Sequence, residues 1–317
     1  MKKREIVILG GTGFVGRYLI NRLSQDDVTI RVPTRRRERN RHLLVNPKVE
    51  LIETDIHDDA KLESLLSGAD VVINLVGILH GSQEAFRKAH AELPERIVKR
   101  CNQLGITRLL HMSALQAGSA NAMSQYLRTK GEGETSAHPL SSHKLHVTSF
   151  RPSVIFGEGD SFFNQFAKLL RLPLVAIPLA CPEARFAPVY AADVAEVMAQ
   201  SIDNPTTFEK RYDICGPKEY SLMELVEITE RAIGVRRLIV GMSDSLSKLQ
   251  AKILGMLPGK LMTTDNYLSM QLTSTCKEPL SALFQIEPTP LEGVIPHYLG
   301  SKHQQVRYMD YRTLAKR

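Results

Sequence analysis

Short apolar runs alternate with longer amphipathic runs through the first half of the chain. The apolar runs are rich in β-branched residues and show no regular alternation, which is typical of strands buried on both faces of a sheet. We predict strands at residues 5–9, 28–33, 49–54, 70–75, 108–112 and 145–150, and helices between them at residues 14–23, 60–66, 84–104 and 124–137. The repeated strand–helix order predicts an α/β fold with a doubly wound parallel sheet and right-handed crossovers.

The pattern becomes less regular after about residue 150, where five prolines fall between residues 152 and 188. Later helices are predicted at residues 194–202, 222–233 and 245–257. We expect a nucleotide-binding domain over residues 1–155, with returning segments near 185–215. The rest, mainly residues 156–317, is expected to form a smaller substrate-binding domain.

The composition is that of an ordinary globular protein. The 317 residues are 43% hydrophobic and 24% charged, and the net charge of +7 is scattered. Four cysteines stand at least 34 residues apart, so the simplest expectation is four buried thiols in a reducing cytosol. The longest apolar stretch, Leu172–Cys181, is too short for a membrane span, which needs about 20 residues. We expect a cytoplasmic protein, with contact to the inner face of the membrane left open.

A glycine-rich turn follows the first strand and opens the first helix. It reads Gly10-Gly11-Thr12-Gly13-Phe14-Val15-Gly16. Gly10 permits the tight turn, Gly13 lets the backbone approach a pyrophosphate, and Gly16 lets helix and strand pack closely. Amides at the helix N-terminus then hold the anion. The turn therefore predicts a Rossmann-type site for NAD(P), with residues 10 and 12–16 as binding residues.

The end of the second strand indicates which nucleotide binds. An acidic residue there would hold the adenosine ribose, but this chain has Arg35 and Arg36, with three more arginines up to Arg41. A guanidinium matches a phosphate, so we predict NADP(H) bound by Arg35 and Arg36, with NAD(H) as the alternative. A solvated basic loop or a nucleic-acid patch would also explain the run, but the arginines begin where the 2′-phosphate should lie.

Two further positions fit the same pocket. Asp55 and Ile56 end the third strand and could contact adenine, although Asp55 could equally begin the next helix. The stretch Leu75-Val76-Gly77 ends the fourth strand, where a small residue would let the backbone pass the cofactor.

Three residues form a candidate catalytic group. Tyr126 and Lys130 are four residues apart and share one face of a helix, and Ser113 ends the fifth strand. A tyrosine phenol has a pKa of about 10, which an adjacent ammonium and a charged nicotinamide would lower. Tyr126 would then move the proton during hydride transfer while Ser113 holds the substrate oxygen. A Tyr–Lys pair alone is usually surface decoration, but here it accompanies the glycine turn.

Together these features resemble the short-chain dehydrogenase/reductase superfamily in its extended or atypical form. The stretches Arg151–Gly157, Pro188–Ala195 and Tyr212–Pro217 resemble its later signatures. The resemblance implies an NAD(P)-binding domain with a small C-terminal domain, and places Pro152 and Val154 at the cofactor. More narrowly, Tyr126–Glu134 and Glu287–Glu292 resemble the nucleotide-binding accessory subunit of mitochondrial complex I and its bacterial relatives. That subgroup implies tight NADPH binding and contact with quinone or respiratory-chain machinery, without a known reaction.

One residue departs from the family pattern. Extended members usually carry an Asn that organises a backbone kink and a relay water, where this chain has His90. His90 either substitutes for it, or the relay is missing and His90 is structural. No metal site is predicted, because His138, His143 and His146 lack neighbouring carboxylates and fit solvated side chains better.

Three functions compete. The first is an NADP(H)-dependent oxidoreductase, or an epimerase, acting on a carbonyl or secondary alcohol. The second is a non-turnover NADPH-binding structural, regulatory or assembly protein. The third, a nucleic-acid binder, is weak. The apolar segment Leu169–Cys181 fits a pocket wall or ordinary core, and helix 245–257 carries lysines beside apolar residues. We therefore expect a lipophilic, quinone- or isoprenoid-like small molecule met at the membrane surface, with a sugar nucleotide as the alternative.

Overall fold

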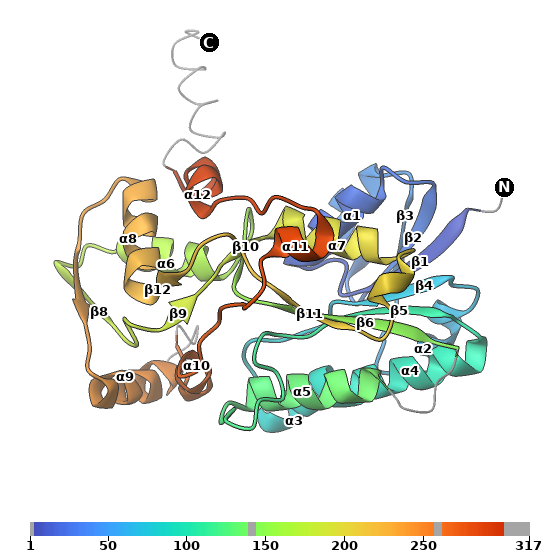
Figure 1. The fold of residues 1–317 in the computed structure, drawn as a ribbon, viewed down its shortest axis with the longest axis horizontal. Coiled ribbons are helices and arrows are strands. Elements are labelled where there is room, and N and C mark those ends of the chain that lie inside the picture. The colour runs from blue at the N-terminus through green and yellow to red at the C-terminus, as the bar shows by residue number, and fades with distance from the viewer. Residues whose placement is uncertain (1–2, 139–143, 257–261, 301–317) are drawn as a thin grey trace, which may run out of the picture.

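A seven-stranded parallel sheet forms the centre of the protein (Figure 1). The structure is a computed structural model that describes residues 3–138, 144–256 and 262–300. The strand order is β11-β6-β5-β4-β1-β2-β3, and every neighbouring pair is parallel. The strands are β1 (Arg4–Leu9), β2 (Val28–Thr34), β3 (Val49–Glu53), β4 (Val71–Asn74), β5 (Arg108–Met112), β6 (His146–Pro152) and β11 (Arg211–Ile214). The predicted α/β fold is thus confirmed, and the order reverses between β1 and β4, where such sheets bind ligands.

Helices cover both faces of the sheet. In Figure 1, α1 (Phe14–Leu23) and α7 (Ala191–Ser201) lie above it, and α2 (Asp59–Leu66), α4 (Leu93–Leu104) and α5 (Gln125–Ala137) lie below. Separate apolar cores fill the two interfaces, because the buried strands present apolar side chains to both sides. The predicted helix 84–104 is three pieces: α3 (Gln83–Arg87), a π-helical turn (Lys88–Glu92) and α4.

The C-terminal half builds a third core between α6 (Phe162–Leu170), α8 (Leu222–Ile233) and α12 (Leu291–Leu299). Helix α8 has the predicted bounds, and Ser221 and Glu224 form a capping box at its start. Helix α6 was not predicted. Its apolar face buries Phe163, Ala167 and Leu170 in this core.

Shorter elements complete the fold. They are the strands β7 (Ile155–Phe156), β8 (Ala176–Leu179), β9 (Arg185–Phe186), β10 (Val189–Tyr190), β12 (Tyr220–Ser221) and β13 (Leu238–Gly241), the helices α9 (Asp244–Met256), α10 (Thr264–Met270) and α11 (Leu280–Phe284), and 3-10 turns at Arg37–Val45 and Pro205–Thr207. Two segments from late in the sequence return to the main sheet. Strand β11 pairs with β6 at its edge, and α11 packs into the apolar core above it. The two-domain division stays a prediction. Within the described ranges, no helix is long and apolar enough to cross a membrane.

The cysteines differ from expectation. Cys215 and Cys276 form a disulfide, although 61 residues separate them, and only Cys101 and Cys181 are free. The prediction of four thiols was wrong because spacing reveals local pairs only. Here the end of β11 meets the segment after α10, and both cysteines pack with Leu115 and Ala187.

Candidate functional site

The glycine turn has the geometry that a dinucleotide phosphate requires. Gly10 has a φ of +80°, and a Cβ there would lie 3.0 Å from the carbonyl carbon of Leu75. At Gly16 a Cβ would lie 2.4 Å from the oxygen of Gly11. Helix α1 can therefore pack against the turn only because residue 16 has no side chain. Gly13 caps α1 without a side-chain acceptor, and the first turn of α1 has no acidic residue. The first amides of α1 therefore suit the pyrophosphate of an NAD(P) cofactor.

Arg35 and Arg36 directly follow β2, at the carboxyl edge of the sheet. Both are exposed, and neither forms an ion pair within the described residues. The Thr34 hydroxyl oxygen accepts hydrogen bonds from the Arg36 amide at 3.2 Å and from Asn40 Nδ2 at 3.0 Å, which shapes this turn. Two uncommitted guanidinium groups at this edge fit a phosphate ligand.

Asp55 lies after the neighbouring strand β3 and does not begin the next helix. Asp58 caps α2 by accepting a hydrogen bond from the Lys61 amide. Asp55 instead accepts one from the His57 amide at 3.0 Å, and this bond lowers the pKa of its carboxyl. The alternative role considered for Asp55 is thereby excluded, and the exposed carboxylate stays a candidate adenosine contact.

Helix α5 brings Lys130 to the ends of β4 and β5. Lys130 Nζ donates a hydrogen bond to the oxygen of Met112 at 2.9 Å, beside Ser113. A Cβ at Gly77 would lie 3.3 Å from the same Nζ, so these segments meet at the crevice. Burial lowers the pKa of Lys130 to about 8, while the nearby Glu134 carboxylate opposes this shift. Lys130 is thus poised to exchange a proton near neutral pH.

Tyr126 lies one turn before Lys130 on the same face. Its ring packs edge-on against His90 at 5.4 Å between centroids and against Phe86 at 6.4 Å. Burial, and then the negative charge of Asp265, raise the pKa of Tyr126 to about 12. The protein's own groups therefore raise this pKa, whereas the sequence predicted that Lys130 would help to lower it.

Asp265 is a site residue that sequence analysis missed. From α10 its carboxylate accepts hydrogen bonds from the amides of Gln125 (2.6 Å) and Tyr126 (3.2 Å) and from the Ser124 hydroxyl (3.0 Å). Ser124 in turn caps the Leu127 amide. The start of α5 is thus held by a carboxylate about 140 residues away in sequence, and no local pattern signals such a contact.

His90 occupies the π-helical turn and is fully enclosed. Its Nε2 accepts a hydrogen bond from the Ile78 amide at 3.0 Å, so Nδ1 carries the proton and donates to the Thr129 hydroxyl at 3.1 Å. Burial and the charge of Lys130 lower its pKa to about 3, which keeps it neutral. With both nitrogens engaged, His90 holds the π-helical turn against α5.

Three polar side chains lie side by side on neighbouring strands of the sheet, where a buried parallel sheet usually has apolar residues. Asn74, His111 and Ser149 are neighbours on β4, β5 and β6. The Asn74 oxygen accepts from the Val76 amide, so its Nδ2 donates to His111 Nδ1 at 3.2 Å. His111 Nε2 must then carry a proton, and this buried atom has no partner within the described residues.

Ser113 directly follows the end of β5, two residues after His111. Its Oγ is also buried without a hydrogen-bond partner in the described chain, although it lies near Glu134 and helps to lower the pKa of that carboxyl. Arg151 and Arg211 pair with Glu134, with shortest distances of 2.5 and 2.8 Å. The Ser113 hydroxyl thus lies at the crevice beside the Glu134 carboxylate.

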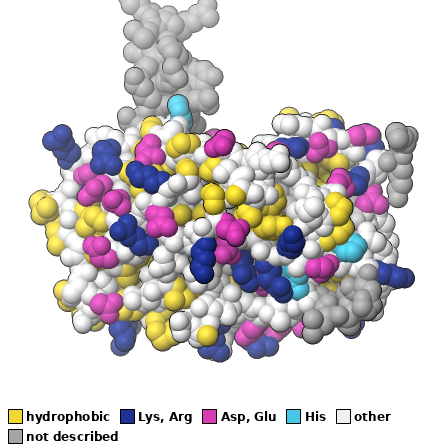
Figure 2. All heavy atoms as spheres, viewed as in Figure 1, with side chains coloured by type: hydrophobic (Ala, Val, Ile, Leu, Met, Phe, Trp, Pro, Cys, Tyr) yellow, Lys and Arg dark blue, Asp and Glu magenta, His cyan; other side chains and the backbone are white. Residues whose placement is uncertain are grey.

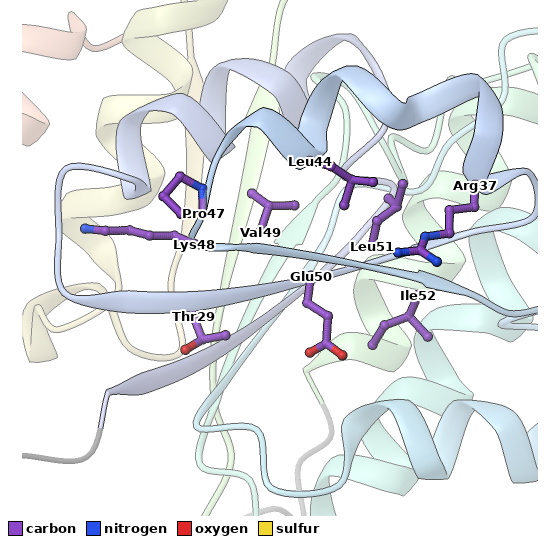
Figure 3. Close-up of a pocket in the computed structure, with 9 residues that line it drawn as sticks. All are labelled: Thr29, Arg37, Leu44, Pro47, Lys48, Val49, Glu50, Leu51 and Ile52. Carbon is purple, nitrogen blue, oxygen red and sulfur yellow. The ribbon is translucent and has the colours of Figure 1, made fainter.

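The surface hollows lie elsewhere. One of about 460 Å³ runs along the outer edge of the sheet, lined by Leu44, Arg37 and residues 47–52 of β3 and its approach (Figure 3). No predicted site residue lines it. No cluster of three or more metal-ligating side chains occurs among the residues that the structure describes.

The sheet order, the glycine turn and the Tyr126–Lys130 helix define the class as an NAD(P)-binding short-chain dehydrogenase/reductase fold. A family model described as "NAD dependent epimerase/dehydratase family" matches residues 6–215. The chain belongs to this family.

Curated relatives and solved structures extend the comparison. The chain is 27% identical over 309 residues to the mitochondrial NADH-ubiquinone oxidoreductase 40 kDa subunit of Neurospora crassa, covering 95% of this chain and 80% of that protein. It is 24% identical over 246 residues to a ceramide reductase of Caulobacter vibrioides, covering 75% and 74%.

Two solved structures share the fold. The UDP-glucuronic acid 4-epimerase of Bacillus cereus has a TM-score of 0.73 at 16% identity, covering 95% of this chain and 99% of its own. The Escherichia coli NADPH-dependent quinone oxidoreductase QOR2 has 0.72 at 18% identity, covering 92% and 99%.

Proposed function

We propose that this chain binds NADP(H) and transfers hydride to or from a carbonyl or secondary alcohol of a lipophilic, quinone-like ligand. The observation that carries the proposal is the meeting of Lys130, Gly77 and the Met112–Ser113 strand end beside the glycine turn. The bound nicotinamide would supply the hydride. Lys130 would bind near it, Ser113 would orient the substrate oxygen, and Tyr126 would hold or give the proton at its phenol oxygen.

The preference for NADP(H) rests on Arg35 and Arg36. Both are exposed at the end of β2 and have no acidic partner in the described residues. No acidic residue stands at this strand end to take the ribose hydroxyls. Asp55, Ile56 and the backbone of Leu75 and Val76 would line the adenosine and nicotinamide sides, with Pro152 and Val154 beyond them.

The lipophilic ligand is supported by the surroundings of Tyr126. Its ring packs with an apolar cluster of Ala114, Ala117, Ala122 and Leu127, together with Leu272 from the C-terminal half. Such walls suit an apolar ligand better than a sugar nucleotide, whose diphosphate needs cationic partners. The relationship to a ceramide reductase agrees with a lipid-derived carbonyl.

A non-turnover NADPH-binding role is the second candidate. Burial, and then Asp265, raise the pKa of Tyr126, and both nitrogens of His90 are engaged by the protein itself, which supports a role without proton transfer. The relationship to a respiratory complex I subunit agrees with a structural or assembly role and contact with the respiratory chain.

The test begins with cofactor binding. Arg35→Ala should weaken NADPH binding by about 1.5–3 kcal/mol, the value of a charged hydrogen bond, and leave NADH binding nearly unchanged. Arg39→Ala, which removes an exposed arginine further along the turn, is the matched control. Equal losses for both cofactors would refute the NADP(H) assignment.

Turnover is tested on the purified protein with NADPH. Quinone analogues, a long-chain lipid ketone and UDP-sugars are added separately while NADPH absorbance is followed. Oxidation with the quinone or ketone supports the oxidoreductase. Tight NADPH binding without oxidation by any of them favours the non-turnover role, and stabilisation by a UDP-sugar would restore the epimerase alternative.

A further inference from the structure

An apolar surface lies at the end of the molecule farthest from the N-terminus. We define the end surface as Leu172, Leu174, Val175, Leu238, Val240, Leu246, Leu249 and Ile253. These are eight of the twelve large hydrophobic residues that are exposed in the described chain, with exposed fractions from 43% to 88%. Figure 2 shows yellow side chains along the left margin, where Figure 1 places β8 and α9. Soluble monomers rarely gather exposed apolar residues in this way.

The small sheet of β8 and β13 is apolar on both faces, but only one face is covered. Ile177 and Leu179 point into the C-terminal core and are 2% and 5% exposed. Their neighbours Ala176 and Pro178 face outward, and the register pairs these with Leu238 and Val240. The sequence analysis expected residues 169–181 to be a pocket wall or core, whereas Leu172–Ala176 is exposed. Apolar residues retained on an open face indicate a partner.

Helix α9 is inverted relative to an ordinary surface helix. Ser247 and Ala251 are fully buried, and the Ser247 hydroxyl oxygen accepts a hydrogen bond from the Cys181 amide at 3.1 Å. The large residues Leu246, Leu249 and Ile253 stand at i, i+3 and i+7 and face outward, each at least 51% exposed. Burial of small polar and apolar groups with exposure of the large ones is the reverse of what an isolated protein needs.

The charges beside this surface identify its partner. Lys248 and Lys252 are exposed on α9, on one side of the apolar stripe, and exposed Arg236 flanks the small sheet. Arg171 is also exposed there, and its guanidinium donates one hydrogen bond to the Leu299 oxygen at 2.9 Å. The neighbouring acids include Glu183, Asp244 and Glu230, and the Glu230 carboxylate accepts a hydrogen bond from the Arg237 amide before β13. The Asp244 carboxylate accepts a hydrogen bond from the Tyr267 hydroxyl at 2.8 Å, which directs it toward α10.

We propose that the end surface inserts its apolar side chains into the interface of an anionic phospholipid membrane, with the flanking lysines and arginines on the headgroups. Apolar residues beside a basic flank are the arrangement that binds such interfaces. The proposal does not depend on turnover. It also joins the membrane to the site, because α9 contacts α10 through Tyr267, and α10 holds the start of the Tyr126 helix.

The experiment is sedimentation of the full chain with vesicles of phosphatidylcholine alone or mixed with phosphatidylserine. We expect binding to the mixed vesicles that weakens as salt is raised. The double variant L249Q/I253Q should lose at least about tenfold in binding, and K248E/K252E should lose the preference for anionic vesicles. The matched control is L44Q/V45Q, because Leu44 and Val45 are exposed apolar residues on the distant 3-10 turn. This control should bind as the original chain does.

Melting temperature and NADPH binding are measured for each variant, so that misfolding and failure of the cofactor assignment are recognised separately. Absence of sedimentation with either vesicle would overturn the proposal, as would an equal loss in L44Q/V45Q and L249Q/I253Q. A concentration-dependent dimer that L249Q/I253Q abolishes, without vesicle binding, would assign the surface to a second copy of the chain and also overturn it.

Discussion

Removal of the Asp265 carboxylate should both destabilise the folded protein and lower the pKa of Tyr126. Asp265 accepts three hydrogen bonds at the start of α5, two of them from backbone amides that no residue of α5 itself caps. It also places a negative charge at this helix N-terminus, whose own first turn has no acidic residue. In Asp265→Ala all three interactions are lost. In Asp265→Asn the charge is lost and one acceptor stays.

The magnitude follows from these contacts. Loss of a helix cap costs about 0.5–2 kcal/mol of stability, and loss of a hydrogen bond to a charged group costs about 1.5–3 kcal/mol. The total should be smaller than the sum for three bonds, because water can partly replace Asp265 at the freed amides. We therefore expect Asp265→Ala to lower the free energy of unfolding by about 2–3 kcal/mol, and the melting temperature by about 4–10 °C. A negative charge disfavours the phenolate, so the pKa of Tyr126 should fall below its value of about 12 in Asp265→Asn.

The assays are thermal unfolding and ultraviolet titration of tyrosine, with spectra of matching Tyr126→Phe proteins subtracted to isolate one phenol. The control is Asp27→Ala, which removes an exposed aspartate with no partner in the described residues. An Asp265→Ala protein that melts with the control would refute the bridge between α10 and α5. An unchanged Tyr126 pKa in Asp265→Asn would show that the carboxylate does not act on the phenol.

Three further predictions concern the site and its support. Tyr126→Phe should bind NADPH as before and lose about 10²–10⁴ in the rate of any turnover, which single-turnover kinetics would measure; an unchanged rate makes Tyr126 structural. Gly133→Ala would place a Cβ 1.7 Å from the His90 oxygen and should destabilise by about 3 kcal/mol or more in urea unfolding, whereas Gly293→Ala, with open space around it, should not. The free energy of unfolding should also decrease as the pH is lowered below about 6.5. The folded pKa values of His90 and His138, about 3 and 4, and the lowered pKa of His111 lie below the usual value, so the unfolded chain takes up protons first. Three such histidines should lower the free energy of unfolding by about 4 kcal/mol at about pH 5.5, relative to its value near neutral pH. His138→Gln should reduce this dependence, and a change at exposed His42 should not.

Local signals carried most of the fold prediction. The bounds of α1, α8 and β5 equal those predicted, because apolar periodicity and nearby glycine or serine caps define them within a few residues. The parallel arrangement of the strands follows from the strand–helix alternation. The glycine turn is partly local as well, since Gly13 and Gly16 are limited by atoms within the turn, whereas Gly10 is limited by the distant Leu75.

The features that were missed depend on contacts between distant segments. Strand β8 was not predicted, and it forms around Pro178 because the strand has one partner and the proline nitrogen needs no acceptor on its free side. The π-helical turn at His90 arises where Gly133 of α5 approaches its backbone. Neither the Cys215–Cys276 disulfide nor the Asp265 cap has a sequence signature, because each joins segments at least 61 residues apart.

The segment that follows α9 connects these missed features and sets the chemistry of the site. From α10, Asp265 holds the start of the Tyr126 helix. Nine residues later the Ser274 backbone oxygen accepts hydrogen bonds from the Ser153 hydroxyl at 2.7 Å and from the Ala187 amide at 3.0 Å, and Cys276 then bonds to Cys215 at the end of β11. One segment thus reaches the loops after β5 and β6. It also acts on the phenol, because the charge of Asp265 adds to burial in raising the pKa of Tyr126 to about 12. The segment that fixes the start of α5 therefore also bears on the residue to which the proposed reaction assigns the proton.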